Sequence, residues 1–473
     1  MRIRRVVLVV ALLTVGLGAW GLNRWRGAQL AVDRVIFLGF DGASPNLMEP
    51  LVAQGKLPAI RRLMEAGSYG HIKTFRPTES GILWTSVATG KTMLKHGVID
   101  WTYVKEAGLQ VPYEDPARKV KTFWEILSER GIRTGTVNWW WTYPAAPIDN
   151  GYIITDRYRL MTIIKPAPET VYPVSMFAGV RDKILRGRKA SLEEMKRRGI
   201  PEWKPEDAGI PFGGSRKTLD AYPTYFAQDV SVDHASDYLW ESQPVPVFST
   251  YFRLIDVTSH FAWHFVDEQL YRRTVELENA GKLTPADVRR LDLEFARVIE
   301  PVYRFMDKII EKYLNRMDDR TALIVCSDHG FMYSRGGYAH AEWASEAPDG
   351  VVFYIGPGVK KGYRIPDATL FDIAPTVLYT IGQPLAQDMD GGLLRGTIED
   401  SYLKRHPISY VPTYESGKRK TGTVADGKTE MDEKILEDLQ TLGYIQAPAQ
   451  KPSEQPAPEP PPQKPQDGAV GPR

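Results

Sequence analysis

The stretch VIFLGFDG, residues 35–42, predicts the fold of this chain. A short apolar run that ends in Gly-Phe-Asp-Gly is typical of a strand buried on both faces of a parallel sheet and followed by a tight loop. The stretch TALIVCSDHG, residues 321–330, repeats this arrangement, and residues 247–255 form a third apolar run just before Asp256. The three segments therefore predict buried strands whose ends carry acidic side chains.

Helical patterns separate the predicted strands. Strands that alternate with helices predict an α/β fold, with a mostly parallel central sheet and helices on both faces. Residues 157–245, rich in proline, tyrosine and charge, interrupt the alternation and predict an inserted cap region over the edge that holds the active site. The helical patterns fall at residues 57–66, 123–130, 284–317 and 371–381, and further strands at 133–141 and 351–355.

Acidic and histidine side chains recur where the predicted strands end. The carboxyl ends of parallel strands form the ligand crevice of such a sheet, so these side chains should meet at one edge. A helix cap or a satisfied polar group explains any one of them equally well, but crowded buried carboxylates are costly without a cation. Mixed Asp and His ligands suit two divalent metal ions, Zn²⁺ first and Mn²⁺ or Fe²⁺ as alternatives. The predicted ligands are Asp41, Asp256, His260, Asp328, His329 and His340.

Thr78 is the candidate nucleophile. It follows Arg76 and Pro77 and precedes an apolar stretch at residues 81–84, so we expect it at or next to the N-terminus of a helix. There the helix dipole favours a phosphate group, and a metal on the hydroxyl oxygen would lower its pKa. A threonine at a helix start is most often only a cap, and the pattern leaves Ser80 as a second candidate.

Short motifs occur along the chain in a definite order. They are FLGFDG (37–42), RPT (76–78), TSVATG (85–90), Ile255-Asp256 with His260, SDHG (327–330), DIAPT (372–376) and MDG (389–391). The ordered set resembles the alkaline phosphatase superfamily, and its type I phosphodiesterase/nucleotide pyrophosphatase branch, over most of residues 35 to about 392. Asp-His-Gly alone is a weak signal, whereas the set is strong.

The resemblance implies an alkaline phosphatase-like fold and hydrolysis of phosphate esters, most of all diesters. It also implies that Thr78 forms a covalent phospho-threonine intermediate, which metal-activated water then hydrolyses. By the same resemblance, Asp41, Thr78, Asp328 and His329 surround one metal, and Asp256, His260 and His340 hold the other.

The chain departs from the family pattern at two places. His340 lies further upstream of Asp349-Gly350 than the resemblance leads us to expect, and His264, four residues after His260, is its competitor. Leu83 stands where nucleotide pyrophosphatases carry an asparagine that donates to a phosphate oxygen. Nucleotide substrates are therefore not implied.

Other functions fit the same residues. A membrane-associated phospho-head-group transferase would pass the group from Thr78 to an acceptor other than water, and a phosphomonoesterase would use the same site. A sulfatase would need a Cys/Ser-x-Pro-x-Arg signature, which the PTESG stretch at 77–81 lacks. A non-catalytic binding protein would have lost a ligand or the nucleophile.

Aromatic and basic residues leave two interpretations open. The run from Trp139 to Trp141 either lines a pocket for the leaving group or packs in the core. Arg157 and Arg253 either reach substrate oxygens or form structural pairs. Cys326, the single cysteine, excludes an internal disulfide and is expected to be a core residue.

The ends of the chain differ from its body, residues 33–446, which is the predicted catalytic domain. Three arginines precede an apolar run from Val6 to Leu22, so residues 1–27 predict an export signal or a retained membrane anchor, and we favour the anchor. The positive flank then places the body outside the cytoplasm, in a periplasmic or extracellular location. Residues 447–473, dominated by Pro, Gln, Glu and Lys, predict a disordered tail.

The overall composition limits the partners. The 473 residues are 43% apolar and 25% charged, which is ordinary for a globular protein. The net charge is only +2, so nothing indicates a nucleic-acid partner or broad electrostatic attraction to anionic membranes. The expected partner is a phosphate-ester substrate of unknown leaving group.

Overall fold

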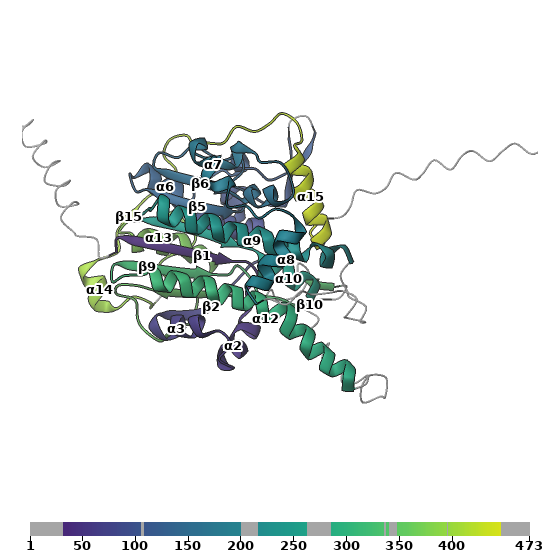
Figure 1. The fold of residues 1–473 in the computed structure, drawn as a ribbon. Coiled ribbons are helices and arrows are strands. Elements are labelled where there is room, and N and C mark those ends of the chain that lie inside the picture. The colour runs from purple at the N-terminus through teal and green to yellow at the C-terminus, as the bar shows by residue number, and fades with distance from the viewer. Residues whose placement is uncertain are drawn as a thin grey trace, which may run out of the picture.

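A nine-stranded sheet forms the centre of the computed structural model (Figure 1). The structure describes residues 32–105, 108–199, 216–262, 285–334, 337–339, 348–394 and 396–445. The strand order across the sheet is β13 (Tyr363–Ile365), β2 (Ser68–Ile72), β12 (Gly350–Ile355), β9 (Thr321–Cys326), β1 (Arg34–Phe40), β8 (Val247–Phe252), β5 (Thr134–Trp139), β6 (Gly151–Thr155) and β7 (Val171–Tyr172).

Five neighbouring strands give the sheet its mostly parallel character. β9, β1, β8, β5 and β6 pair in parallel, whereas β12 is antiparallel to both of its neighbours. The predicted fold class is therefore confirmed. The carboxyl ends of β1, β8 and β9 lie side by side, because the register pairs Gly39 with Tyr251 and Cys326.

Helices cover both faces of the sheet, as the alternation of β1 shows. On one face Phe37 lies against Phe123 of α6 (Phe123–Glu129), and Gly39 faces Trp84 of α4 (Ser80–Thr89). A Cβ on Gly39 would lie 2.7 Å from the Trp84 ring, so only glycine allows this approach. On the other face Phe40 stacks on Phe252, which meets α12 (Pro285–Arg316). α3 (Pro58–Ala66) and α9 (Arg216–Ser242) also lie on that face.

One predicted strand is shorter than expected, and this changes where two site residues lie. β8 ends at Phe252 rather than Ile255, and α10 (Leu254–Ala262) begins directly afterwards. The cause is Asp229 of α9, whose carboxylate accepts the backbone N–H groups of Arg253 and Leu254 at 2.9 and 2.7 Å and so caps the new helix. Asp256 therefore lies in the first turn of a helix and not in a loop after a strand.

The region predicted as an insertion, residues 157–245, contains α7 (Phe177–Arg181), α8 (Gly187–Arg197) and α9. α9 contacts β5 and β8, so this helix belongs to the layer on the face of the sheet. The remaining described α-helices are α2 (Pro45–Ala53), α5 (Met93–His96), α13 (Ile373–Thr380), α14 (Asp400–Arg405) and α15 (Glu430–Leu442).

The run from Trp139 to Trp141 is core, which settles one open interpretation. All three indoles are buried. Trp140 and Trp141 pack against each other and against Trp101, and Trp139 packs against Trp84. Cys326 is likewise buried.

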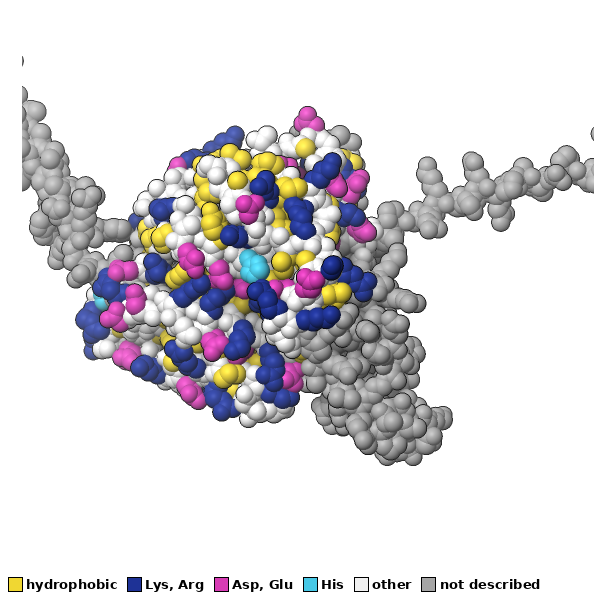
Figure 2. Space-filling model, viewed as in Figure 1, with side chains coloured by type: hydrophobic (Ala, Val, Ile, Leu, Met, Phe, Trp, Pro, Cys, Tyr) yellow, Lys and Arg dark blue, Asp and Glu magenta, His cyan; other side chains and the backbone are white. Residues whose placement is uncertain are grey.

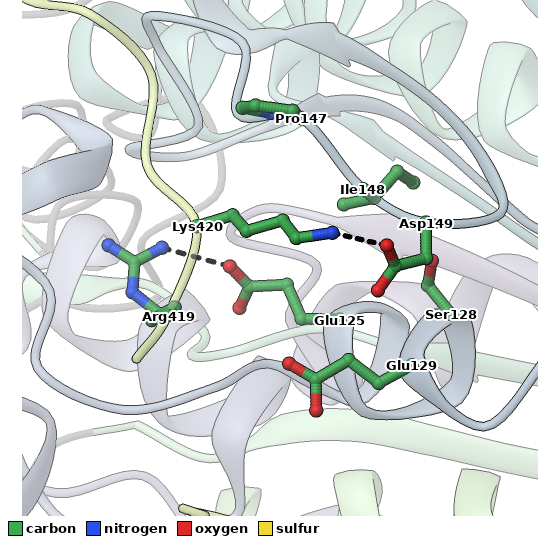
Figure 3. Close-up of a pocket in the computed structure, with 8 residues that line it drawn as sticks. All are labelled: Glu125, Ser128, Glu129, Pro147, Ile148, Asp149, Arg419 and Lys420. Atoms are coloured by element: carbon green, nitrogen blue, oxygen red, sulfur yellow. Dashed lines mark hydrogen bonds and ion pairs between the residues drawn. The ribbon is translucent and has the colours of Figure 1, made fainter. Parts of the chain in front are cut away.

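The chain before α15 is tied to α6 by buried ion pairs. Arg419 contacts Asp115 at 2.9 Å and Glu125 at 2.8 Å, and Arg118 contacts the same two carboxylates. Figure 3 shows Arg419 directed at Glu125 in a pocket that both residues line. Burial raises the pKa of Glu125, but the two guanidinium groups outweigh it and lower the value to about 2. Because its charges are already paired, this pocket is an anchor for the C-terminal part of the chain.

The surface mixes charges of both signs. On the face in Figure 2, Lys and Arg side chains are interspersed with Asp and Glu. Among the described residues, no helix is both long and apolar enough to cross a bilayer. The predicted anchor at residues 1–27 and the predicted tail at 447–473 lie outside the described residues.

Candidate metal centre

Two neighbouring strand ends bring three ionisable side chains together. Asp41 directly follows β1, and Asp328 and His329 follow β9. All three are at most 1% exposed, and each offers a ligand atom within 4.8 Å of the others. The Nε2 atom of His329 lies 3.3 Å from Asp41 Oδ1 and 3.5 Å from Asp328 Oδ2. This edge is therefore a candidate cation site.

The orientation of His329 suits a metal ligand. Its Nδ1 atom lies 2.9 Å from the carbonyl oxygen of Gly330, to which it donates. That bond leaves Nε2 facing the carboxylates, the arrangement that second-shell partners impose on metal-bound imidazoles. Burial lowers the pKa of His329, but Asp328 and Asp41 outweigh it and raise the value to about 10. The two carboxylates thus favour positive charge at the position that Nε2 faces.

The negative charges of the buried carboxylates are only partly compensated by the protein groups around them. Burial, followed by the charge of Asp41, raises the pKa of Asp328 well above its usual range. Burial also acts to raise the pKa of Asp41, but the hydrogen bond and charge of His329 hold it below the usual value. Within the described chain, Oδ2 of Asp328 and Oδ1 of Asp256 accept no hydrogen bond although both atoms are buried. Buried acceptors without donors fit a bound divalent cation.

α10 adds two further candidate ligands. Asp256 and His260 are four residues apart, so they share one face of the helix. Oδ1 of Asp256 lies 3.5 Å from His260 Nε2 and 3.9 Å from His329 Nε2. The second set of predicted ligands therefore adjoins the first.

An unpredicted residue also reaches this second set. The hydroxyl of Tyr444 lies 2.7 Å from Asp256 Oδ2 and 2.6 Å from His260 Nε2.

The two candidate nucleophiles lie at the start of α4. Thr78 is fully buried and stands two residues before the helix, with Glu79 at the N-cap position. Ser80 is the first helical residue, and its hydroxyl donates to Asp41 Oδ1 at 3.2 Å and lies 3.5 Å from His329 Nε2. Thr78 is thus next to the helix N-terminus, and Ser80 contacts two candidate ligands directly.

Asp41 is supported from behind by two aromatic side chains. Tyr251, at the end of β8, donates its hydroxyl to Asp41 Oδ2, and Trp140 donates to the Tyr251 hydroxyl at 2.6 Å. Sequence patterns gave no indication of this chain of hydrogen bonds, because Tyr251 reads only as a strand residue.

The remaining predicted site residues fall into three groups. His340 and its competitor His264 lie outside the described residues. Leu83 is a buried residue of α4 and offers no donor. Arg157 and Arg253 are buried and form ion pairs with Asp432 at 2.6 Å and with Asp438 at 2.7 Å, which supports their structural interpretation.

Fold and site together define an α/β protein with a candidate metal centre at the carboxyl ends of its parallel strands. The type I phosphodiesterase/nucleotide pyrophosphatase model matches residues 35–368, so the chain belongs to that family within the alkaline phosphatase superfamily. It is an enzyme of the phosphodiesterase/nucleotide pyrophosphatase type. No curated sequence matches the chain.

Several solved structures align with the chain at low identity. Human ectonucleotide pyrophosphatase/phosphodiesterase 5 is 10% identical over 76% of this chain and 97% of its own, with a TM-score of 0.42. Phosphonate monoester hydrolase from Silicibacter pomeroyi is 14% identical over 77% and 76%, with a TM-score of 0.38. Phosphonoacetate hydrolase from Sinorhizobium meliloti is 14% identical over 63% of this chain, with a TM-score of 0.37. The match spans 56% of the length of that last enzyme.

Proposed function

We propose that the protein hydrolyses phosphodiesters with the hydroxyl of Thr78 and two divalent metal ions, Zn²⁺ in the first instance and Mn²⁺ as the alternative. The observation that carries the proposal is the convergence of Asp41, Asp256, Asp328 and His329, with two buried carboxylate oxygens that accept no hydrogen bond within the described chain. Family membership adds the reaction type.

Each residue has a proposed role. Asp41, Thr78, Asp328 and His329 would hold one metal, and Asp256, His260 and His340 the other. When bound, the metals supply positive charge that favours the ionised hydroxyl and offsets the charge on the phosphoryl oxygens. Thr78 Oγ attacks phosphorus, the bond to the leaving alcohol breaks, and a phospho-threonine ester forms. Water then attacks phosphorus and releases Thr78 with its proton.

The start of α4 favours this reaction. The first N–H groups of a helix have no partner within the helix and carry a partial positive charge. A phosphoryl group on Thr78 lies next to that N-terminus, where these groups donate to its oxygens. Asp41 is held for its role by Tyr251, and His329 by the Gly330 carbonyl.

Ser80 is a second candidate nucleophile, because its hydroxyl contacts both Asp41 and His329. Hydrolysis of bis-p-nitrophenyl phosphate by Thr78→Ala and Ser80→Ala variants separates the two. We expect the Thr78 variant to lose turnover by several orders of magnitude while it keeps most of its metal. The Ser80 variant should keep substantial turnover. The opposite pattern would assign the nucleophile to Ser80.

The substrate and location are further proposals. We expect metal-dependent cleavage of the diester to exceed that of p-nitrophenyl phosphate, and a chelator to abolish it. Preference for the monoester would indicate a phosphatase on the same site. No cleavage of either ester by protein that holds two metals would favour a head-group transferase. We further propose that residues 1–27 anchor the enzyme in a membrane, with its body in the periplasm or outside the cell.

A further inference from the structure

The C-terminal segment, residues 429–445, follows the family match by about 60 residues and yet reaches the candidate metal centre. α15 begins with a capping box in which Thr429 and Asp432 bond each other's backbone N–H groups. It ends at Gly443, whose φ of 86° lies in the left-handed region that favours glycine. The N–H of Tyr444 returns to the carbonyl of Leu439 at 2.9 Å. This turn brings the Tyr444 side chain back to Asp256 and His260 of α10.

Two buried ion pairs hold α15 against the edge of the sheet. Asp432 pairs with Arg157 and Asp438 with Arg253, and the four side chains are largely or fully buried. Arg253 is the residue that immediately follows β8, so this second pair ties α15 to the segment that leads into α10. Buried pairs of this kind fix geometry, because breaking one leaves an uncompensated charge.

The ring and the hydroxyl of Tyr444 have separate partners. The ring lies 4.5 Å from the ring of Trp101 and 4.7 Å from the imidazole of His260, measured between centroids. The hydroxyl donates to Oδ2 of Asp256 at 2.7 Å and lies 2.6 Å from His260 Nε2. Packing against Trp101 needs only an aromatic ring, so it does not explain why a hydroxyl lies between two candidate ligands.

We propose that Tyr444 is a positioning residue of the second metal site and that the C-terminal segment is part of the metal centre. The proposal rests on the two-metal function proposed above. By donating to Oδ2, Tyr444 fixes the carboxylate of Asp256 so that Oδ1 faces the site. That oxygen is buried and accepts no hydrogen bond within the described chain, so it is the atom available to a cation.

The two sets of candidate ligands differ in how the fold supports them. Ligands that directly follow β1 and β9 are fixed by the sheet, whereas Asp256 and His260 lie on the short helix α10. Partners that orient ligand side chains typically contribute about 10- to 100-fold in metal affinity. Tyr444 supplies such a partner from the far end of the chain.

The test is metal binding by the full-length Tyr444→Phe variant. This change removes the hydroxyl and keeps the ring that packs on Trp101, so the fold should be retained. Zn²⁺ affinities are measured by competition with a chromophoric chelator, and metal content by elemental analysis. Tyr158→Phe is the matched control. It also removes a buried tyrosine hydroxyl, but that hydroxyl donates to the Val180 carbonyl at 3.0 Å and contacts none of the candidate ligands named above.

We expect the wild type and the control to bind two Zn²⁺ ions. The Tyr444 variant should bind one ion with unchanged affinity and the other about 10- to 100-fold more weakly. Unchanged affinity at both sites would overturn the proposal, and tighter binding would do so as well, since the hydroxyl would then compete with the metal. A wild type that binds fewer than two ions would refute the two-metal function itself, and this proposal with it.

Discussion

Replacing Asp229 with asparagine should make the stability of the protein less sensitive to pH. Asp229 is fully buried, and its carboxylate caps α10 through the N–H groups of Arg253 and Leu254. Burial raises its pKa from 3.8 to about 7, against the lowering effect of those N–H groups and of Arg253. A raised carboxyl pKa stabilises the fold fully below the unfolded value, and this contribution is lost as pH rises through the folded value.

The size of the effect follows from the shift. Each pKa unit corresponds to about 1.4 kcal/mol, so about three units amount to roughly 4 kcal/mol between pH 3.8 and about pH 7. The asparagine variant keeps a carbonyl oxygen for the cap and has no proton to lose. Its stability relative to wild type should therefore increase across this pH range and become constant above it.

The assay is urea unfolding, monitored by tryptophan fluorescence, at several pH values between about 4 and about 8. In this range Asp229 is already ionised in the unfolded chain, whereas the folded protein loses this proton only near the upper end. Any constant difference from the new amide group cancels, because only the change with pH is compared. Asp182→Asn, at an exposed side chain, is the control for the same replacement on the surface. A difference between wild type and the Asp229 variant that does not change with pH would refute the reasoning.

Three further outcomes can be measured. A chelator should lower the thermal unfolding midpoint and added Zn²⁺ restore it, since metal at about 100 times its Kd adds about 2.7 kcal/mol; an unchanged midpoint would contradict a bound metal. Gly81→Ala should destabilise the protein by about 1–3 kcal/mol in urea unfolding, because its Cβ would lie 2.1 Å from the Trp141 ring. Gly427→Ala is the control, because a Cβ there meets nothing within 4 Å. Asp432→Asn should lower the free energy of unfolding by about 3–5 kcal/mol, because it leaves Arg157 buried and unpaired. Adding Arg157→Met to that variant should restore part of the lost stability. Additive effects of the two substitutions on the free energy of unfolding would argue against the pair.

The parallel strands could be predicted because their signal is local. Residues 35–40 and 322–326 are short apolar runs, and an acidic residue follows the first run directly and the second run after Ser327. The boundary at Phe252 could not be predicted, because residues 247–255 are apolar throughout except for Ser249, Thr250 and Arg253. What ends the strand is the carboxylate of Asp229, which is 24 residues away from Arg253 in the sequence. A contact of this kind leaves no mark in the local pattern.

The candidate site likewise contains residues that the sequence predicts and a residue that it does not. Asp41, Asp328 and His329 lie at the strand ends where the pattern put them. Tyr444 was not predicted, although the apolar spacing of α15 and the Gly443-Tyr444 ending indicate a capped helix. Nothing in those residues says which part of the fold the helix meets. The position of α15 depends on ion pairs of Asp432 and Asp438 with buried arginines that lie more than 180 residues earlier in the sequence.

α10 shows why the two halves of the centre differ in what supports them. Asp41 directly follows β1, and Asp328 follows β9 after Ser327; both strands are hydrogen-bonded on both sides. α10 has fewer than three turns, and short helices are marginal without outside contacts. Its N-terminus is held by Asp229 of α9, and its Asp256 side chain by Tyr444 after α15. Changes in α9 or α15 therefore act on Asp256 and His260 first, whereas the backbone of Asp41 is held by the sheet.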